Sequence, residues 1–203
     1  MCLTNAIPLE THEGARKCYK VLISDGKGCF VSPFQHDEYR CGEVKYADGY
    51  LDITVEKNDF LLGKSLYGLQ DVYFEYTPKE KITVGGGFLH TCETIEEALK
   101  FLLESPSAVS FREFPYWIIV ECEIPEGCMG FVGAWDCYAI FGYASTALMV
   151  KAPLTLEEVM SKANGCGFSD DVMELIESKY DKTAYDVKAL QIMYMMPKER
   201  LDK

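Results

Sequence analysis

GGGFLHTCETIEEA, residues 85–98, joins a flexible glycine run to the start of a helix. Thr94 and Glu97 have the spacing of a capping box, in which a threonine hydroxyl and a glutamate carboxylate each accept from the other residue's backbone N–H. Apolar residues then recur at helical spacing from Ile95 to Leu102, so we expect one face of this helix to be buried. The stretch therefore predicts a helix from about residue 94 that docks on the structure around it.

Three residues with useful chemistry, His90, Thr91 and Cys92, stand just before this helix. The free N–H groups and the positive dipole end of a helix N-terminus favour a bound anion, and they lower the pKa of a nearby thiol. The glycines permit positive φ and a close backbone approach, which a phosphate-binding loop and an ordinary turn need equally. Two interpretations follow: a ligand site, or a bulge with a satisfied histidine.

Segments on both sides of this joint predict a sheet. Residues 16–23 (RKCYKVLI) alternate between two faces, with Tyr19 on one and Lys20 on the other, and residues 29–32 return as a hairpin partner. Residues 116–124 (YWIIVECEI) are almost continuously apolar, which is typical of a central strand covered on both faces.

A second hairpin is predicted from residues 43–46 and 50–56, which flank Asp48-Gly49. Residues 72–77 (VYFEYT) also have a strand-like composition. The fold class that follows is α+β: a curved, mainly antiparallel sheet of about six to nine strands with one packed helix and a helical C-terminal appendage.

The chain changes character at Pro153. Thr155 and Glu158 form a second capping box that opens a short helix to about Ala163. Residues 169–171 cap another helix, which runs to Tyr180 with inward residues Val172, Leu175 and Ile176, and a last helix begins near Thr183. We therefore expect a β-rich domain over residues 1–152 and a helical appendage over residues 153–203, packed on the same core.

The composition restricts the possible partners. The chain of 203 residues has 20 basic and 32 acidic side chains and a net charge of -12, which argues against nucleic acid or an anionic membrane as a partner. Nine cysteines without a CxxC pair are typical of small core residues in a reducing compartment, and no signal or membrane-spanning segment is seen. A cytoplasmic protein is expected. Its three histidines are far apart in the sequence, so we expect no metal site.

A polar loop over residues 33–42 follows the first hairpin, and loops on a β scaffold often carry binding residues. The loop can also be interpreted as a solvated connection without a binding role. Together with the first strand and the glycine joint, the loop supplies the predicted ligand site, in which basic residues bring charge, His90 and Thr91 bring hydrogen-bond donors, and tyrosines bring stacking surface: Tyr19, Lys20, Gln35, Tyr39, Arg40, His90 and Thr91.

The segment from Gly87 to Cys92, followed by Glu97-Ala98 and by the strand around Glu121, is similar to small bacteriophage and bacterial domains of unassigned function. Those domains carry a Gly-aromatic-His-x-Cys segment before a helix that bears Glu-Ala. The resemblance covers about residues 16–152. Taken with the predicted ligand site, it leads to the hypothesis of a phage-type accessory protein that binds a small anionic ligand, such as a nucleotide derivative, and does not turn it over.

The layout is also distantly similar to ADP-ribosyltransferase-like folds. That resemblance implies a dinucleotide cleft lined by Tyr19 and His90, with NAD as cofactor and His90 and Glu121 as the candidate catalytic residues. Two alternatives to ligand binding therefore stand beside it: such an enzyme, or an acidic inhibitor that binds a basic host protein. An N-terminal nucleophile at Cys2 is a further, weaker interpretation.

Overall fold

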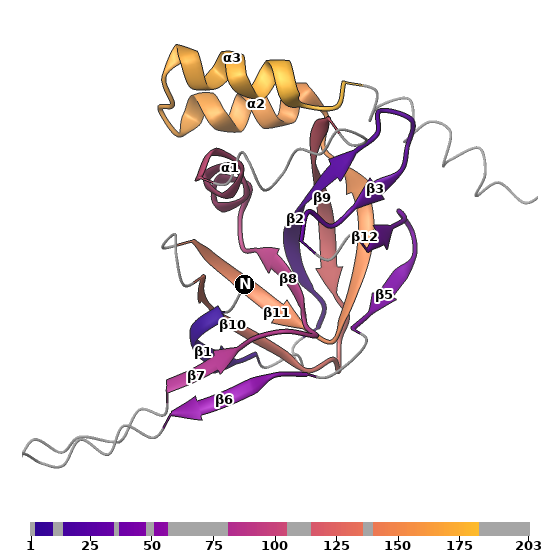
Figure 1. Ribbon diagram of the computed structural model, residues 1–203, viewed down its shortest axis with the longest axis vertical. Coiled ribbons are helices and arrows are strands. Elements are labelled where there is room, and N and C mark those ends of the chain that lie inside the picture. Colours follow the sequence, from indigo (N-terminus) through magenta and orange to yellow (C-terminus); the bar gives the residue numbers. More distant parts are fainter. Residues whose placement is uncertain are drawn as a thin grey trace, which may run out of the picture.

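The computed structural model describes residues 3–9, 14–34, 37–47, 51–56, 81–104, 115–135 and 140–182. Within them the chain forms a curled antiparallel sheet with three helices at one end (Figure 1), so the predicted α+β class is confirmed. The described strands number twelve, more than expected. Residues 72–77, the helix predicted from Thr183, Cys2 and Gln35 lie outside the described residues.

The main path of the sheet runs β5-β12-β9-β2-β8-β11-β10-β1-β7-β6, with β3 paired to β2 and β4 paired to β3. The strands are β1 (Leu3–Pro8), β2 (Arg16–Ser24), β3 (Phe30–Val31), β4 (Glu38–Tyr39), β5 (Val44–Tyr46), β6 (Ile53–Glu56), β7 (Lys81–Val84), β8 (Leu89–Cys92), β9 (Tyr116–Ile124), β10 (Gly130–Trp135), β11 (Phe141–Ser145) and β12 (Ala147–Pro153). The pairings between these strands are antiparallel. An isolated parallel bridge joins Trp117 to Tyr180.

Strands β2 and β9 form the longest ladder, which runs from the pair Arg16 and Ile124 to the pair Ser24 and Tyr116. Strand β9 lies between β2 and β12, so its predicted central position is confirmed. The register places Lys20 opposite Val120 and Tyr19 opposite Glu121, on alternate faces. Both the strand at residues 16–23 and its return hairpin through β3 are as predicted.

The second predicted hairpin is wrong. Strand β5 pairs with β12, whereas β6 pairs with β7, so residues 43–46 and 50–56 lie at opposite edges of the sheet. The Asp48-Gly49 pair gives a local turn signal, but the partners of both strands come from sequence far downstream. A local pattern therefore identified these strands without identifying what they pair with.

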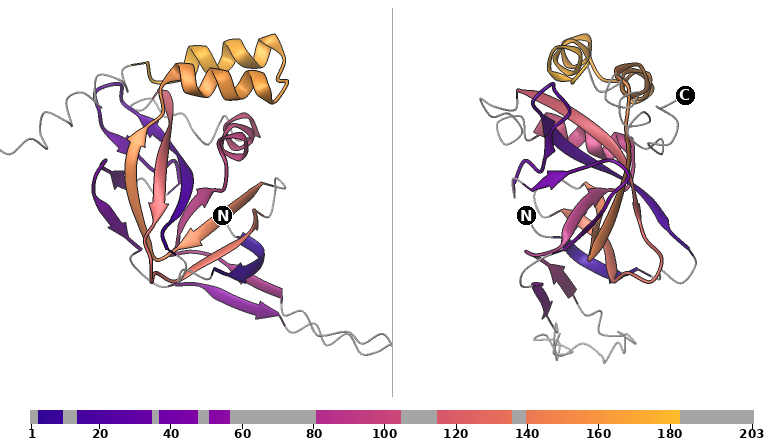
Figure 2. Two further views of the ribbon diagram at one scale, coloured as in Figure 1. Left: turned by 180° about the vertical axis from the view of Figure 1, so that it is seen from behind. Right: turned by 90° about the vertical axis from the view of Figure 1, so that its right-hand side faces the viewer.

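Three helices stand beside the sheet: α1 (Ile95–Glu104), α2 (Leu156–Gly165) and α3 (Asp170–Lys179). Figures 1 and 2 show α2 and α3 side by side, with α1 between them and the sheet. The capping box of α2 is complete, because Thr155 Oγ1 accepts from the backbone of Glu158 and the Glu158 carboxylate accepts from the backbone of Thr155. On α3 the inward prediction holds for Ile176 but fails for Leu175, which is 37% exposed.

The capping box predicted for α1 is only half formed. Thr94 Oγ1 accepts from the backbone N–H of Glu97 at 3.1 Å. The Glu97 carboxylate does not return to Thr94; it accepts from the Phe141 backbone N–H at 2.9 Å and from Lys100 at 2.7 Å. Glu97 thereby fixes the start of β11 to the helix.

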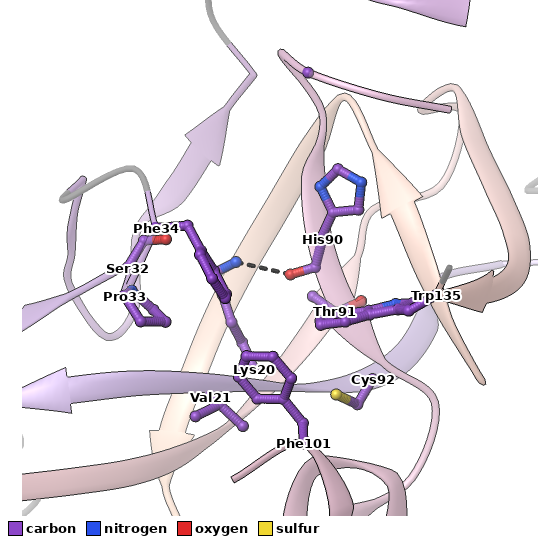
Figure 3. Close-up of a pocket in the computed structure, with 11 residues that line it drawn as sticks. Lys20, Val21, Ser32, Pro33, Phe34, His90, Thr91, Cys92, Phe101 and Trp135 are labelled. Atoms are coloured by element: carbon purple, nitrogen blue, oxygen red, sulfur yellow. Dashed lines mark hydrogen bonds between the residues drawn. The ribbon is translucent and has the colours of Figure 1, made fainter. Parts of the chain in front are cut away.

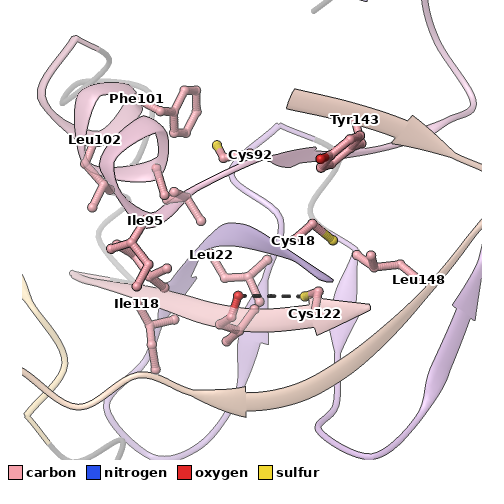
Figure 4. Packing of buried hydrophobic residues seen from close by; sticks show 14 of the residues in the cluster. Cys18, Leu22, Cys92, Ile95, Phe101, Leu102, Ile118, Cys122, Tyr143 and Leu148 are labelled. Atoms are coloured by element: carbon pink, nitrogen blue, oxygen red, sulfur yellow. Dashed lines mark hydrogen bonds between the residues drawn. The ribbon is translucent and has the colours of Figure 1, made fainter. Parts of the chain in front are cut away.

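The core joins sheet and helices (Figure 4). It contains residues from β2, β9 and α1, together with Val159 and Ala163 of α2 and Ile176 of α3. Cys18 and Cys122 face each other across β2 and β9 and are fully buried, as expected of core cysteines. Cys18, Cys29, Cys92, Cys122 and Cys166 are free thiols.

The chain after α3 is held against β9. The Tyr180 hydroxyl donates to the Leu154 carbonyl at 2.8 Å, and Asp181 accepts from the hydroxyl of Ser24. The Asp181 backbone also donates to the Trp117 carbonyl at 2.8 Å. Within the described ranges the helices are too short to traverse a bilayer.

Candidate functional site

A cavity of about 320 Å³ opens beside strands β2 and β8 (Figure 3). Its walls come from five places in the chain: β2, the turn after β3, the glycine joint with β8, helix α1 and the end of β10. This volume lies at the lower end of the range of small-molecule sites, which is about 300–1,000 Å³. The residues that line it are Lys20, Val21, Ser32, Pro33, Phe34, Gly86, His90, Thr91, Cys92, Phe101 and Trp135.

The glycine joint turns the chain from β7 into β8. Gly87 has a φ of 83°, in the region where glycine is favoured, and Gly86 lines the cavity. His90 and Cys92 lie just before α1, as expected, and they are residues of β8, so they belong to the sheet. The cavity therefore adjoins a strand and is not built on the N-terminus of α1.

Lys20 is the charged side chain of this cavity and is only 6% exposed. Strands β2 and β8 pair at a single position, Tyr19 with Cys92. Next to that pair, the Lys20 ammonium donates to the His90 carbonyl at 2.7 Å. A side chain, and not a backbone N–H, thus satisfies this carbonyl. The ammonium also lies 5.0 Å from the centre of the Tyr39 ring, a cation–π contact.

None of the described residues that line the cavity carries a carboxylate. The ion pairs recorded among the described residues involve other lysines and Arg40. A buried ammonium without a counter-charge is costly, because the interior replaces its hydration poorly. The carbonyl and the ring offset part of that cost, and the cavity leaves space for a negative group next to Lys20.

The His90 side chain is neutral near pH 7 and does not act as a charged hydrogen-bond donor. Burial, and after it the positive charge of Lys20, lower the pKa of His90 to about 4, although the carbonyls of Phe88 and Val84 act in the opposite direction. Its Nδ1 lies 3.0 Å from the Phe88 carbonyl oxygen, so in the neutral ring Nδ1 carries the proton. The contribution of His90 to Lys20 is its backbone carbonyl.

Four aromatic rings follow one another along the cavity. Phe34 and Phe101 have ring centroids 5.8 Å apart, Phe101 and Trp135 have centroids 5.0 Å apart, and Trp135 and His90 have centroids 6.3 Å apart. The last two pairs are T-shaped. We call these four residues the aromatic row.

Cys92 is fully buried, and burial raises the pKa of its thiol. The expectation that the nearby helix lowers this pKa is therefore wrong. Removal of the thiolate from water outweighs a helix dipole whose effect is limited to its first turn. Thr91 is also buried, and its side chain interacts with Cys18, whose pKa burial raises to about 12.

The remaining predicted site residues are distributed differently. Tyr39 is 2% exposed and lies beneath the ammonium groups of Lys20 and Lys45, so it supports the site from behind. Arg40 is exposed and pairs with Glu38 at 3.0 Å. Neither residue lines the cavity.

Tyr19 and Glu121 lie on the other face of β2 and β9. Both line a second, shallower hollow of about 420 Å³ that also includes residues of α2. Glu121 accepts from Lys17 at 2.6 Å, and the Lys17 ammonium lies 5.5 Å from the Tyr19 ring centre. The structure thus brings together Lys20, His90 and Thr91, but it does not bring His90 together with Glu121 or Tyr19.

The sequence analysis missed Phe34, Phe101 and Trp135 as cavity residues. Phe34 follows Pro33 at the turn after β3, and Trp135 is a large residue at the end of a strand rich in glycine and alanine. Phe101 belongs to the apolar face of α1 and resembles any other core residue there. A search for groupings of His, Cys, Asp and Glu finds no metal site among the residues that the structure describes.

Comparison of the chain with protein-family models, with curated proteins and with solved structures finds no match.

Proposed function

We propose that the protein binds a small anionic ligand in the cavity beside β2 and β8. The observation that supports this most directly is the Lys20 ammonium, which is buried at the cavity wall with no carboxylate among the lining residues that the structure describes. A ligand oxyanion there would supply the missing counter-charge, and charge-assisted hydrogen bonds of this kind are about twice as strong as neutral ones. The resemblance to nucleotide-binding layouts places nucleotide-derived anions in the panel to be tested.

The geometry of Lys20 supports binding in a fixed orientation. An ammonium has three N–H donors, and the His90 carbonyl takes one of them. The contact with Tyr39 holds the side chain from a second direction. The site is therefore largely formed before a ligand arrives, which lowers the entropy cost of binding.

A thermal-shift and calorimetric comparison tests the proposal. The anions are inorganic phosphate, acetate, benzoate and nucleoside monophosphates, applied in excess to the wild-type protein and to two variants. We expect at least one anion to raise the Tm of the wild type, since a ligand that binds only the folded state stabilises it. Lys20→Met should abolish that shift. The variant is expected to fold, because it replaces an uncompensated buried charge with an apolar chain of similar length.

Lys17→Met is the matched control. Lys17 lies on the same strand, but it is exposed on the opposite face, where it pairs with Glu121. This variant should retain the full ligand-induced shift. Absence of stabilisation by every anion, or an equal shift in Lys20→Met, would overturn the proposal.

A further inference from the structure

We infer that the preferred ligand, if the proposed function holds, is a single planar aromatic ring that carries one carboxylate. The inference combines three features of the cavity: the buried ammonium of Lys20, the aromatic row and the volume. Each feature excludes part of the broad class of small anions.

The charge of the site matches a monoanion. The other cations near Tyr39 and β4 are already engaged: Lys45 lies 3.6 Å from the Asp37 carboxylate and Arg40 pairs with Glu38. A phosphate monoester carries a charge of about −1.5 to −2 at neutral pH, so Lys20 alone would leave it under-neutralised in a buried site. A carboxylate carries one charge and accepts from the two N–H groups of Lys20 that His90 leaves.

The walls of the site match a flat ring. Phe34, Phe101 and Trp135 surround the same hollow as the Lys20 side chain in Figure 3. Phe101 and Trp135 meet edge to face, and Phe34 is tilted by 59° against Phe101, so a further ring can make both stacking and edge contacts. Such contacts contribute about 0.5–1.5 kcal/mol beyond the burial of area. A flexible or puckered apolar group would gain the burial but not the ring contacts.

The volume limits the ligand to one ring. At about 320 Å³ the cavity is near the lower limit for small-molecule sites, so it fits a ring with its acid group better than a base with its sugar and phosphate. Lys20 belongs to β2, whereas Phe34, Phe101 and Trp135 come from the turn after β3, α1 and β10, so a carboxylate on the ammonium and a ring among these side chains can be bound at the same time.

A set of matched acids tests this inference by titration calorimetry. Benzoate is the aromatic monoacid, cyclohexanecarboxylate has a puckered ring with the same charge, acetate lacks the ring, and benzamide lacks the charge. We expect benzoate to bind at least tenfold more tightly than each of the other three. Lys20→Met should abolish benzoate binding.

Phe34→Ala tests the aromatic row without disturbing the core, because Phe34 is 48% exposed. It should weaken benzoate severalfold and leave acetate unchanged. Phe141→Ala, which removes another exposed phenylalanine that does not line the cavity, is the control and should bind benzoate normally.

The outcomes separate the two proposals. If phosphate, acetate or a nucleotide binds in a Lys20-dependent manner and benzoate binds no more tightly, the anion site stands and the aromatic-acid inference is overturned. Equal binding of benzoate and cyclohexanecarboxylate also overturns it. If no anion binds at all, the proposed function fails and the inference fails with it.

Discussion

At the scale of single residues, Lys20 and His90 influence each other through space and through the backbone. The ammonium donates to the His90 carbonyl, and its charge helps to lower the pKa of the imidazole. The histidine therefore remains neutral next to a cation, so the cavity has one positive group and not two. This arrangement follows from the alternation of β2, which points Lys20 to the inner face.

The neutral state of His90 predicts a dependence of stability on pH. Its pKa is about 4 in the folded protein and about 6.5 in an unfolded chain. Between these values the unfolded chain binds a proton that the folded protein does not, so stability is fully present above about pH 6.5 and falls as the pH drops toward 4. The loss is on the order of 3 kcal/mol.

Urea unfolding of the wild type and of His90→Gln across this pH range measures the effect. The carboxylates contribute to the slope of both proteins, so the informative quantity is the difference between them. We expect the unfolding free energy of the variant to depend less steeply on pH than that of the wild type. Identical slopes would mean that His90 titrates normally in the folded state.

At the scale of elements, strand β11 must approach β8 closely for the wall of the cavity to form. A Cβ added at Gly142 would lie 2.2 Å from the Thr91 carbonyl oxygen and 2.6 Å from Trp135 Nε1. Gly142→Ala should therefore push β11 away from β8 and cost about 1–3 kcal/mol or more of unfolding free energy.

Gly130→Ala is the control for this prediction. At Gly130 the nearest atom to an added Cβ is 3.4 Å away, in the flexible side chain of Leu9. Chemical denaturation should show a much smaller change for this variant. Equal effects at the two glycines would contradict the close packing of β11 on β8.

The N-caps of the two C-terminal helices, α2 and α3, differ in their hydrogen bonds. Thr155 takes part in both bonds of the capping box of α2, whereas Ser169 stands at the N-cap of α3 without a side-chain hydrogen bond. Thr155→Ala should cost about 1 kcal/mol of unfolding free energy. Ser169→Ala should cost clearly less in the same denaturation measurement, and the opposite order would contradict the assigned caps.

These elements also show what a sequence can predict. The strand at 16–23 and the capping box at Thr155 rest on residues that are neighbours in the chain, and both predictions are confirmed. The pairing of β5 with β12 joins segments about one hundred residues apart, which no local pattern specifies. The same holds for the candidate site. Lys20 and His90 could be singled out from the sequence by residue type, but the hydrogen bond between them could not be predicted.

At the scale of the whole molecule, the helices share the core of the sheet. Ile176 of α3 and Val159 of α2 belong to the same buried cluster as the strands, and Tyr180 bonds to the Leu154 carbonyl. We therefore expect the helices and the sheet to unfold together. Near-ultraviolet circular dichroism, which reports on Trp117 and Trp135, should give the same midpoint as the far-ultraviolet signal. Separate midpoints would show that the C-terminal helices form an independent unit.

The order of the cavity walls along the chain has a consequence for biosynthesis. Lys20 leaves the ribosome early, but its acceptor on His90 follows 70 residues later and Trp135 later still. Translation proceeds from the N-terminus, so the nascent chain carries this lysine for most of its synthesis with no cavity around it. A ligand that recognises the finished site would therefore be captured only after Trp135 has been synthesised.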